Sequence, residues 1–299
     1  MSDFTVTASP HIRSKITTSG IMLMVIIALM PATGFAIFNF GLDVLYLVLV
    51  TVGTAVVTEF ICGLILKRAI TIDDYSAVVT GLLLSLSLPP GAPLWLGAVG
   101  GFFAILVVKM LFGGLGQNFM NPAMAARCFL FISFTSIMTK YRYDAEIAEN
   151  RTMLEMLLNN TDGAIGETSI LALLLGAVIL IIIGVIDLKI PGMYIISFMV
   201  FIVLFTGNMD ATYLITHLTG GGLLLAAFFM ATDYSTRPIS AGAQLFYGIL
   251  LGFLTAIFRF YGAGFEGVAF AIIIGNLIVP LLDRKYRGLN PAGKIGKKS

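Results

Sequence analysis

Residues 163–169 combine glycines, hydroxyls and a carboxylate immediately before a long apolar run. Gly163 and Gly166 would let the backbone approach a bulky group closely. Thr168 and Ser169, which follow Glu167, would place hydroxyls at the positive end of the next helix, a position that suits a phosphate group. Capping of that helix by a hydroxyl explains the same pattern. The residue types therefore indicate either a phosphate-binding turn or an ordinary helix start.

A second polar interruption, residues 113–124, is rich in glycine and contains Asn121 followed by Pro122. This pair is typical of the first turn of a helix, where free N–H groups attract anions or carbonyl oxygens. Asn118 belongs to the same turn. The segment predicts either a binding loop or a tight turn between closely packed helices.

Carboxylates inside apolar runs are candidates for holding Na⁺ or a proton, because an ionisable group in lipid is costly to keep. Glu59 and Asp233 are the candidates expected near the inner face, and Glu266 is a weaker one near the outer face. Asp233 follows Thr232 at the end of an apolar run, so these two residues could also line a ligand site. An ion pair between Asp233 and Arg237, four residues on, is the alternative.

Other polar side chains in these runs have simpler explanations. Lys109 and Arg259 lie at the ends of apolar runs, where a long side chain can extend its charge to the interface. Cys62 and Cys128 stand alone, without the paired spacing of a metal or disulfide site, so they are interpreted as small buried residues, the alternative being ligands for a cluster shared with another subunit. We expect no metal site and no catalytic residue on this chain.

The sequence lacks the motifs of common soluble enzymes. It has no Gly-x-Ser-x-Gly elbow, no Walker loop and no His-Glu-x-x-His, which argues against hydrolysis and ATP-driven transport. No Gly-x-Gly-x-x-Gly turn connects a predicted strand to a helix, so we do not expect the chain to bind NAD. The basic residues are scattered rather than gathered in a patch, so no nucleic-acid partner is indicated.

The elements that position these residues are membrane spans. Of the 299 residues, 58% are hydrophobic and 11% are charged, whereas a soluble domain has about 25% charged residues. The apolar runs approach or exceed the ~20 residues that a helix needs to cross a bilayer, and they do not alternate as the strands of a β-barrel would. We therefore expect an all-α polytopic membrane protein with about ten spans, some short or broken. The expected spans are 20–39, 43–66, 75–88, 93–112, 121–138, 169–187, 190–207, 211–231, 240–258 and 264–282.

The two halves of the chain resemble each other at a fixed offset, which aligns Pro90 with Pro238 and Gly100 with Gly248. Each half would hold an odd number of spans, so the second half would enter the membrane from the opposite side. Such inverted repeats place ligand sites near the interface between them. We expect two five-helix inverted repeats.

This arrangement predicts five segments: a cytoplasmic N-terminal segment 1–19, a first repeat 20–138, an outer-face loop 139–168, a second repeat 169–282 and a basic tail 283–299. Most of the 18 Lys and Arg residues then fall on one side. Since cytoplasmic loops collect basic residues, both termini are expected in the cytoplasm.

The order of these motifs resembles that of the D subunits of the Rnf ion-translocating oxidoreductase complex and of the related B subunits of the sodium-pumping NADH:quinone reductase. The resemblance covers about residues 20–283. It rests on Ser76 to Leu83, Lys109 to Asn118, Asn121 to Met124, Gly163 to Ser169, Met230 to Asp233, and Gly275 with Asn276.

The resemblance implies a subunit of an electron-transport enzyme in the cytoplasmic (inner) membrane, one that translocates Na⁺ or H⁺ and has no complete active site on this chain. Its partners would be the other membrane subunits and a second flavoprotein subunit. NAD and ferredoxin would bind elsewhere in the complex.

The resemblance also implies the cofactors. FMN would be attached through its phosphate to the hydroxyl of Thr168, although many relatives have a Ser-Gly-Ala-Thr-like run where this chain has Glu167 before Thr168. A second, non-covalent flavin (riboflavin) would lie between the repeats, lined by Asn118, Asn121, Thr232 and Asp233. Flavin would relay electrons between partner subunits.

Two alternatives to this function stay open. One is the B-type subunit of the quinone-reducing enzyme, which the short segment before the first span makes less favoured. The other is a channel or small-solute transporter, because inverted repeats with broken helices also build those.

Overall fold

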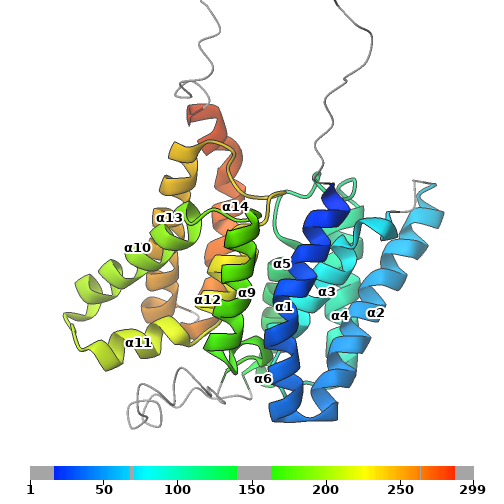
Figure 1. Ribbon diagram of the computed structural model, residues 1–299, viewed down its shortest axis with the longest axis horizontal. Helices are drawn as coiled ribbons and strands as arrows, with labels where there is room; N and C mark the ends of the chain where they lie inside the picture. The colour runs from blue at the N-terminus through cyan, green and yellow to red at the C-terminus, as the bar shows by residue number, and fades with distance from the viewer. Residues whose placement is uncertain (1–16, 68–70, 140–162, 263, 287–299) are drawn as a thin grey trace, which may run out of the picture.

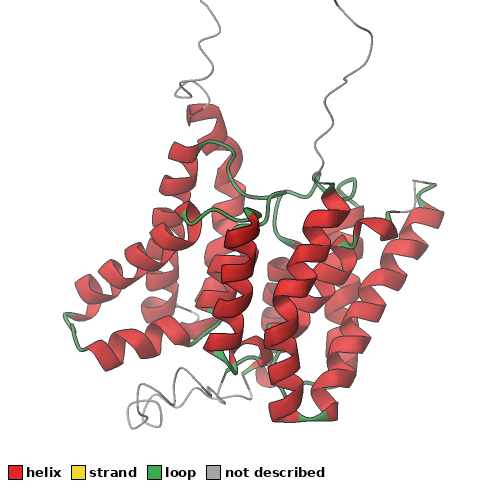
Figure 2. Ribbon diagram, viewed as in Figure 1, coloured by secondary structure: helices red, strands yellow, loops and turns green. Residues whose placement is uncertain are grey.

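The computed structural model describes residues 17–67, 71–139, 163–262 and 264–286, and every regular element in these ranges is a helix (Figure 2). In chain order the elements are α1 (Thr18–Phe40), α2 (Leu42–Ile65), η1 (Ile72–Asp74), α3 (Ser76–Leu86), α4 (Leu94–Phe103), η2 (Ala104–Met110), α5 (Pro122–Ser133), α6 (Thr135–Met138), η3 (Ile165–Glu167), α9 (Ile170–Ile183), α10 (Lys189–Thr206), α11 (Ala211–Thr219), α12 (Leu223–Leu225), η4 (Ala226–Met230), α13 (Ala241–Tyr261), η5 (Gly264–Glu266) and α14 (Gly267–Tyr286).

The expected all-α, polytopic membrane architecture is confirmed. In the described ranges α1, α2, α10, α13 and α14 are long and apolar enough to cross a membrane. Shorter apolar helices occupy Ser76–Leu86, Leu94–Met110, Pro122–Ser133 and Ile170–Ile183. The run at 75–88 is therefore short, as the prolines that follow it predict.

The span predicted at 211–231 is not one continuous helix. It is a pair, Ala211–Thr219 and Leu223–Met230, bent by 61°. Gly221 and Gly222 lie at the bend with φ angles of 72° and 69°. These left-handed values are easily adopted only by glycine, so the glycines break the span at this point.

Glycines also let neighbouring helices approach closely. A Cβ atom on Gly176 of α9 would overlap the carbonyl oxygen of Ala28 in α1. In the same way, a Cβ atom on Gly252 of α13 would overlap Ser197 of α10. Small residues at such crossings are the usual means of packing helices within a membrane, where no hydrophobic force drives helices together.

The element order matches an inverted duplication. Under the 148-residue offset that pairs Pro90 with Pro238, α1 corresponds to α9, α2 to α10, α3 to α12 with η4, α4 with η2 to α13, and α5 to α14, while α11 has no counterpart. The equivalent helices α1 and α9 pack together, as do α5 and α14. Helices α1 and α9 run in opposite directions (Figure 1). A two-fold axis in the membrane plane would produce these relations.

The helical bundle has two ends. We call the end that carries the start of α1 and the end of α14 the terminal face (Figure 1). The end that carries α6 and η3 is the opposite face. The polar interruptions of the sequence are divided between these two faces.

Candidate functional site

A cavity of about 470 Å³ lies between the two halves near the terminal face. The first half contributes the start of α1, one side of α3, Lys109 of η2 and the turn before α5. The second half contributes the end of α9 and the residues after it, part of η4, and residues 232–235 with Arg237. The volume is within the ~300–1,000 Å³ typical of cofactor sites. The four residues predicted to line a second flavin site, Asn118, Asn121, Thr232 and Asp233, all line this cavity.

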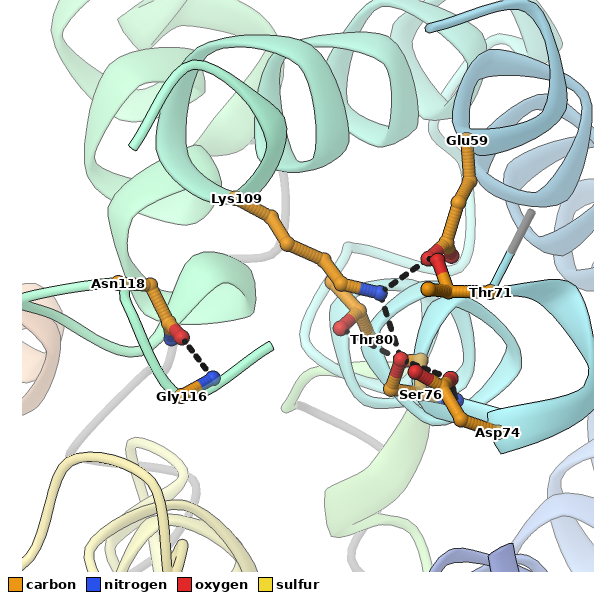
Figure 3. Close-up of polar contacts among 8 residues, drawn as sticks. All are labelled: Glu59, Thr71, Asp74, Ser76, Thr80, Lys109, Gly116 and Asn118. Atoms are coloured by element: carbon orange, nitrogen blue, oxygen red, sulfur yellow. Dashed lines mark hydrogen bonds and ion pairs between the residues drawn. The ribbon is translucent and has the colours of Figure 1, made fainter. Parts of the chain in front are cut away.

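Asn121 holds one wall of the cavity in place. Its Oδ1 accepts hydrogen bonds from the backbone N–H groups of Ala123 (3.0 Å) and Met124 (3.2 Å), which makes it the N-cap of α5 as the sequence predicts. Its Nδ2 donates to the carbonyl oxygen of Met230 at 3.3 Å. Asn118 accepts from the N–H of Gly116 at 3.2 Å (Figure 3). Both asparagines therefore stabilise the turn that forms this wall.

Thr232 and Asp233 close the cavity from the second half. The Asp233 carboxylate accepts hydrogen bonds from the N–H and hydroxyl of Ser235 at 3.2 and 2.8 Å, and from the hydroxyl of Thr236 at 3.3 Å. Burial raises the pKa of Asp233, and these hydrogen bonds partly oppose the rise. Within the described contacts no ion pair joins Asp233 to Arg237, so the simple pairing that the sequence allowed is not seen. Arg237 lines the cavity instead.

A buried charge network adjoins the cavity. Lys109 Nζ lies 2.7 Å from Glu59 Oε1 and donates to Ser76 Oγ at 2.5 Å. The hydroxyl of Thr71 donates to the same Glu59 oxygen at 2.5 Å, and Ser76 in turn donates to the carboxylate of Asp74 (Figure 3). Lys109 and Glu59 are each 1% exposed. The expectation that Lys109 extends to the interface is therefore wrong, because its charge is neutralised inside the protein.

A second charge network lies toward the opposite face. Arg127 on α5 forms a two-pronged ion pair, at 2.9 and 3.1 Å, with Glu266 at the end of η5, just before α14. Arg259 is buried and donates to the carbonyl oxygens of His217 and Gly220 at the end of α11. Arg259 thus stabilises the broken helix rather than extending to the interface. Glu266, an expected ion-coupling candidate, is held by Arg127.

Glu167 ties the predicted phosphate-binding turn to the broken span. One of its carboxylate oxygens accepts from the N–H of Gly221 at 3.0 Å, while the other is buried without a hydrogen-bond partner among the described residues. Burial raises the pKa of Glu167 to about 7, although the nearby Arg127 lowers it. Gly163 packs against the Glu167 side chain, and Gly166 packs against Leu86. These glycines therefore permit close packing within the protein.

Thr168 and Ser169 have different surroundings. Thr168 is 1% exposed, and its hydroxyl donates to the carbonyl oxygen of Ile165 at 2.8 Å. Ser169 is the N-cap of α9, because its hydroxyl accepts from the N–H of Ala172 at 3.3 Å. The capping alternative is thus confirmed for Ser169. The Thr168 hydroxyl does not reach a surface in this conformation.

A family model described as the NQR2, RnfD, RnfE family matches residues 5–290. The chain belongs to this family. It is 44% identical to the D subunit of the Na⁺-translocating ferredoxin:NAD⁺ oxidoreductase complex of Acetobacterium woodii, over 94% of this chain and 93% of that protein. It is 36% identical to the D subunit of the proton-translocating ferredoxin:NAD⁺ oxidoreductase complex of Clostridium ljungdahlii, over 94% of each chain. The D subunit of the ion-translocating oxidoreductase complex of Methanosarcina acetivorans is 32% identical, over 95% of this chain and 96% of that protein.

As a member of the NQR2, RnfD, RnfE family, the chain is a multi-pass membrane subunit of an electron-transport complex, as its sequence predicts. The described residues contain no group of three or more His, Cys, Asp and Glu side chains that could hold a metal ion. Cys62 and Cys128 are free and buried, as expected. The other members of the Glu59 network, namely Thr71, Asp74, Ser76 and Lys109, were not among the predicted site residues. Ser76 and Lys109 begin two of the stretches that carry the family resemblance, whereas the sequence carries no signal for Thr71 and Asp74.

Proposed function

We propose that this chain relays electrons through bound flavin inside an ion-translocating ferredoxin:NAD⁺ oxidoreductase. The cavity between the two halves is the observation that carries the proposal, because it provides space for a redox-active ring between the two halves of the membrane domain. The names of the relatives supply the class of complex. One relative is named for Na⁺ and another for protons, so either ion is consistent with the proposal.

The cavity fits a second, non-covalent flavin such as riboflavin. Its wall combines apolar side chains, which would cover a flat ring, with a few polar groups near the terminal face. Lys109, Thr232, Asp233 and Arg237 would contact the polar edge or the ribityl chain, and Asn118 and Asn121 would keep the wall in shape. A flavin supplies the capacity to take and release one or two electrons. The chain itself would enclose the flavin ring and place the charged side chains of Lys109, Asp233 and Arg237 near it.

Covalent FMN at Thr168 makes a specific structural demand. A phosphoester does not fit the described conformation, because the Thr168 hydroxyl is buried and donates to Ile165. Attachment therefore requires the turn at 163–169 to open and expose that hydroxyl. The proposal is supported by the position of the turn, which directly precedes α9 and is held by the hydrogen bond from Gly221 to Glu167 and by that from Ile165 N–H to the Leu88 carbonyl oxygen.

The remaining assignments follow from the complex as a whole. We place both termini on the cytoplasmic side of the inner membrane, since the basic residues concentrate at the terminal face in the predicted topology. The other membrane subunits and a second flavoprotein subunit are the proposed partners, and NAD and ferredoxin bind to subunits other than this one.

Among the three carboxylates proposed for ion coupling, the described contacts favour Glu59. Glu266 is held by Arg127, and Asp233 accepts hydrogen bonds from Ser235 and Thr236. Glu59 is paired with Lys109, which lines the cavity. The Oε2 atom of Glu59 is buried without a hydrogen-bond partner among the described residues. A carboxylate with an unused oxygen can accept a cation or a proton.

The test of the proposed function is a flavin assay on the intact complex. After acid denaturation and gel electrophoresis, the band of this chain should fluoresce, and the fluorescence should vanish in Thr168→Ala but persist in Ser169→Ala. The supernatant should contain an extractable flavin. A colourless chain with no extractable flavin would favour the channel or transporter alternative, and quinone reduction by NADH without ferredoxin would favour the B-type subunit.

A further inference from the structure

The network around Lys109 has more oxygen atoms than Lys109 uses. Glu59 presents Oε1 and Oε2, and Thr71, Asp74 and Ser76 add further side-chain oxygens around the same point (Figure 3). Glu59 is 1% exposed, and its Oε2 has no hydrogen-bond partner among the described residues. A buried carboxylate oxygen without a partner is costly, so Lys109 alone leaves this oxygen cluster incompletely satisfied.

These oxygen atoms match the preference of a hard cation. Small cations of groups 1 and 2 bind carboxylate and hydroxyl oxygens rather than nitrogen or sulfur. The ammonium group of Lys109 already occupies such a position, at 2.7 Å from Glu59 Oε1 and 2.5 Å from Ser76 Oγ. It acts there as a cation attached to the protein chain.

Lys109 also has an alternative position for its ammonium group, in the cavity. Its side chain and that of Ser76 both line the 470 Å³ cavity. Lys109 belongs to the π-helical segment η2, and its flexible four-carbon side chain has several rotatable bonds through which the ammonium group can turn toward the cavity. A negatively charged ligand in the cavity would hold the ammonium group there and leave the oxygen cluster free.

We propose that Glu59, Thr71, Asp74 and Ser76 form a site for a small monovalent metal cation, and that this cation and the Lys109 ammonium group occupy the site alternately. The inference deepens the proposed role of Glu59 in ion translocation and rests on it. Simultaneous occupancy is excluded because two positive charges a few ångströms apart repel each other strongly in a site of low dielectric constant. Lys109 therefore competes directly with the ion.

The experiment measures the thermal stability of the purified full chain in detergent while NaCl replaces N-methylglucamine chloride at constant ionic strength. A bound cation raises stability in proportion to ln(1 + [Na⁺]/Kd). Lys109→Gln removes the competing ammonium group, so the apparent Kd for Na⁺ is expected to fall by about tenfold or more. The matched control is Lys189→Gln, because Lys189 pairs with Asp187 at the surface and should leave the Na⁺ response unchanged.

Two further variants test whether the response arises at this site. Adding Glu59→Gln to Lys109→Gln should abolish the Na⁺ response. Ser76→Ala keeps the Lys109–Glu59 ion pair but removes one neutral oxygen, so it should weaken the response. If Lys109→Gln folds only in Na⁺, its yield with and without Na⁺ gives the same comparison.

Several outcomes would overturn the proposal. An unchanged Na⁺ response in Lys109→Gln would show that Lys109 does not compete, and a response that survives Glu59→Gln would locate the ion elsewhere. Stabilisation by acid but not by Na⁺ would make the site a proton site. The flavin assay is independent of these measurements, so a coloured chain without a Na⁺ response rejects the cation site alone. A colourless chain with the response rejects the electron relay alone.

Discussion

Asn121 in the first half and Met230 in the second are joined by a hydrogen bond of 3.3 Å from Asn121 Nδ2 to the Met230 carbonyl oxygen. The same asparagine caps α5 through its Oδ1. One side chain therefore starts a helix and connects the two halves at the wall of the cavity.

Replacement of Asn121 tests this double role. Asn121→Ala loses the cap and the hydrogen bond to the buried Met230 carbonyl oxygen, so we expect a loss of about 2 kcal/mol in stability. Asn121→Ser keeps a capping oxygen and loses the bond to Met230 without adding a charge, so it should be the milder change. Thermal unfolding in detergent measures both. If the second variant melts at the same temperature as the unmodified chain, the bond between the halves contributes nothing.

Gly222 is expected to tolerate no side chain. Its φ of 69° is left-handed, and a Cβ atom would lie 3.1 Å from Glu167 Oε1 and 3.2 Å from Arg127 Nη1. Gly222→Ala should therefore cost about 1–2 kcal/mol from the backbone alone. Gly192→Ala is the control, since Gly192 lies in α10 with no atom within 4 Å of its Cβ position. A melting temperature for Gly222→Ala as high as that of the control would contradict this view of the bend.

The Arg127–Glu266 pair is predicted to be structural. Arg127→Met removes the arginine partner of a largely buried carboxylate and should cost about 3–5 kcal/mol, whereas Arg127→Met combined with Glu266→Met should recover part of that loss. The double-mutant cycle is read by thermal unfolding. Ion transport per electron should stay unchanged in any Glu266 variant that folds, and a changed ratio would make Glu266 an ion-coupling residue again.

The sequence predicted the spans well because the length of an apolar run is enough to identify a membrane helix. It also predicted the cap at Asn121, since Asn before Pro is a local signal. The partner of Lys109 could not be predicted, because Glu59 is 50 positions away and meets it only through the packing of α2 against η2. The 61° bend between Ala211–Thr219 and Leu223–Met230 could not be located from the sequence either. Glycines within an apolar run are equally compatible with close helix packing, and only the backbone conformation distinguishes the two.

The closed turn at Thr168 gives a prediction that needs no flavin. Thr168→Cys should react with a water-soluble maleimide more slowly than Thr139→Cys, because Thr139 is exposed on the same face. A tenfold difference corresponds to an opening free energy of about 1.4 kcal/mol. Adding Glu167→Ala removes the bond to Gly221 and should accelerate the labelling of Cys at position 168. The native Cys62 and Cys128 are buried and give the background rate.

Equal labelling of the Thr168→Cys and Thr139→Cys variants would show that the turn is already open. In that case flavin attachment at Thr168 would need no conformational change, and Glu167 would have no role in controlling access.

Ion coupling distinguishes Glu59 from Asp233. Glu59→Gln removes the charge that Lys109 neutralises, so we expect fewer ions transported per electron, with covalent flavin unchanged. Asp233→Asn keeps an oxygen that can accept from Ser235 and Thr236, so the ratio should stay near that of the unmodified complex. The measurement is ion flux and electron transfer by the intact complex in sealed vesicles. Asp187→Asn, at the exposed Lys189 pair, is the control. If Glu59→Gln and Asp233→Asn both transport the usual number of ions per electron, the ion path avoids these carboxylates, and the chain contributes electron transfer alone.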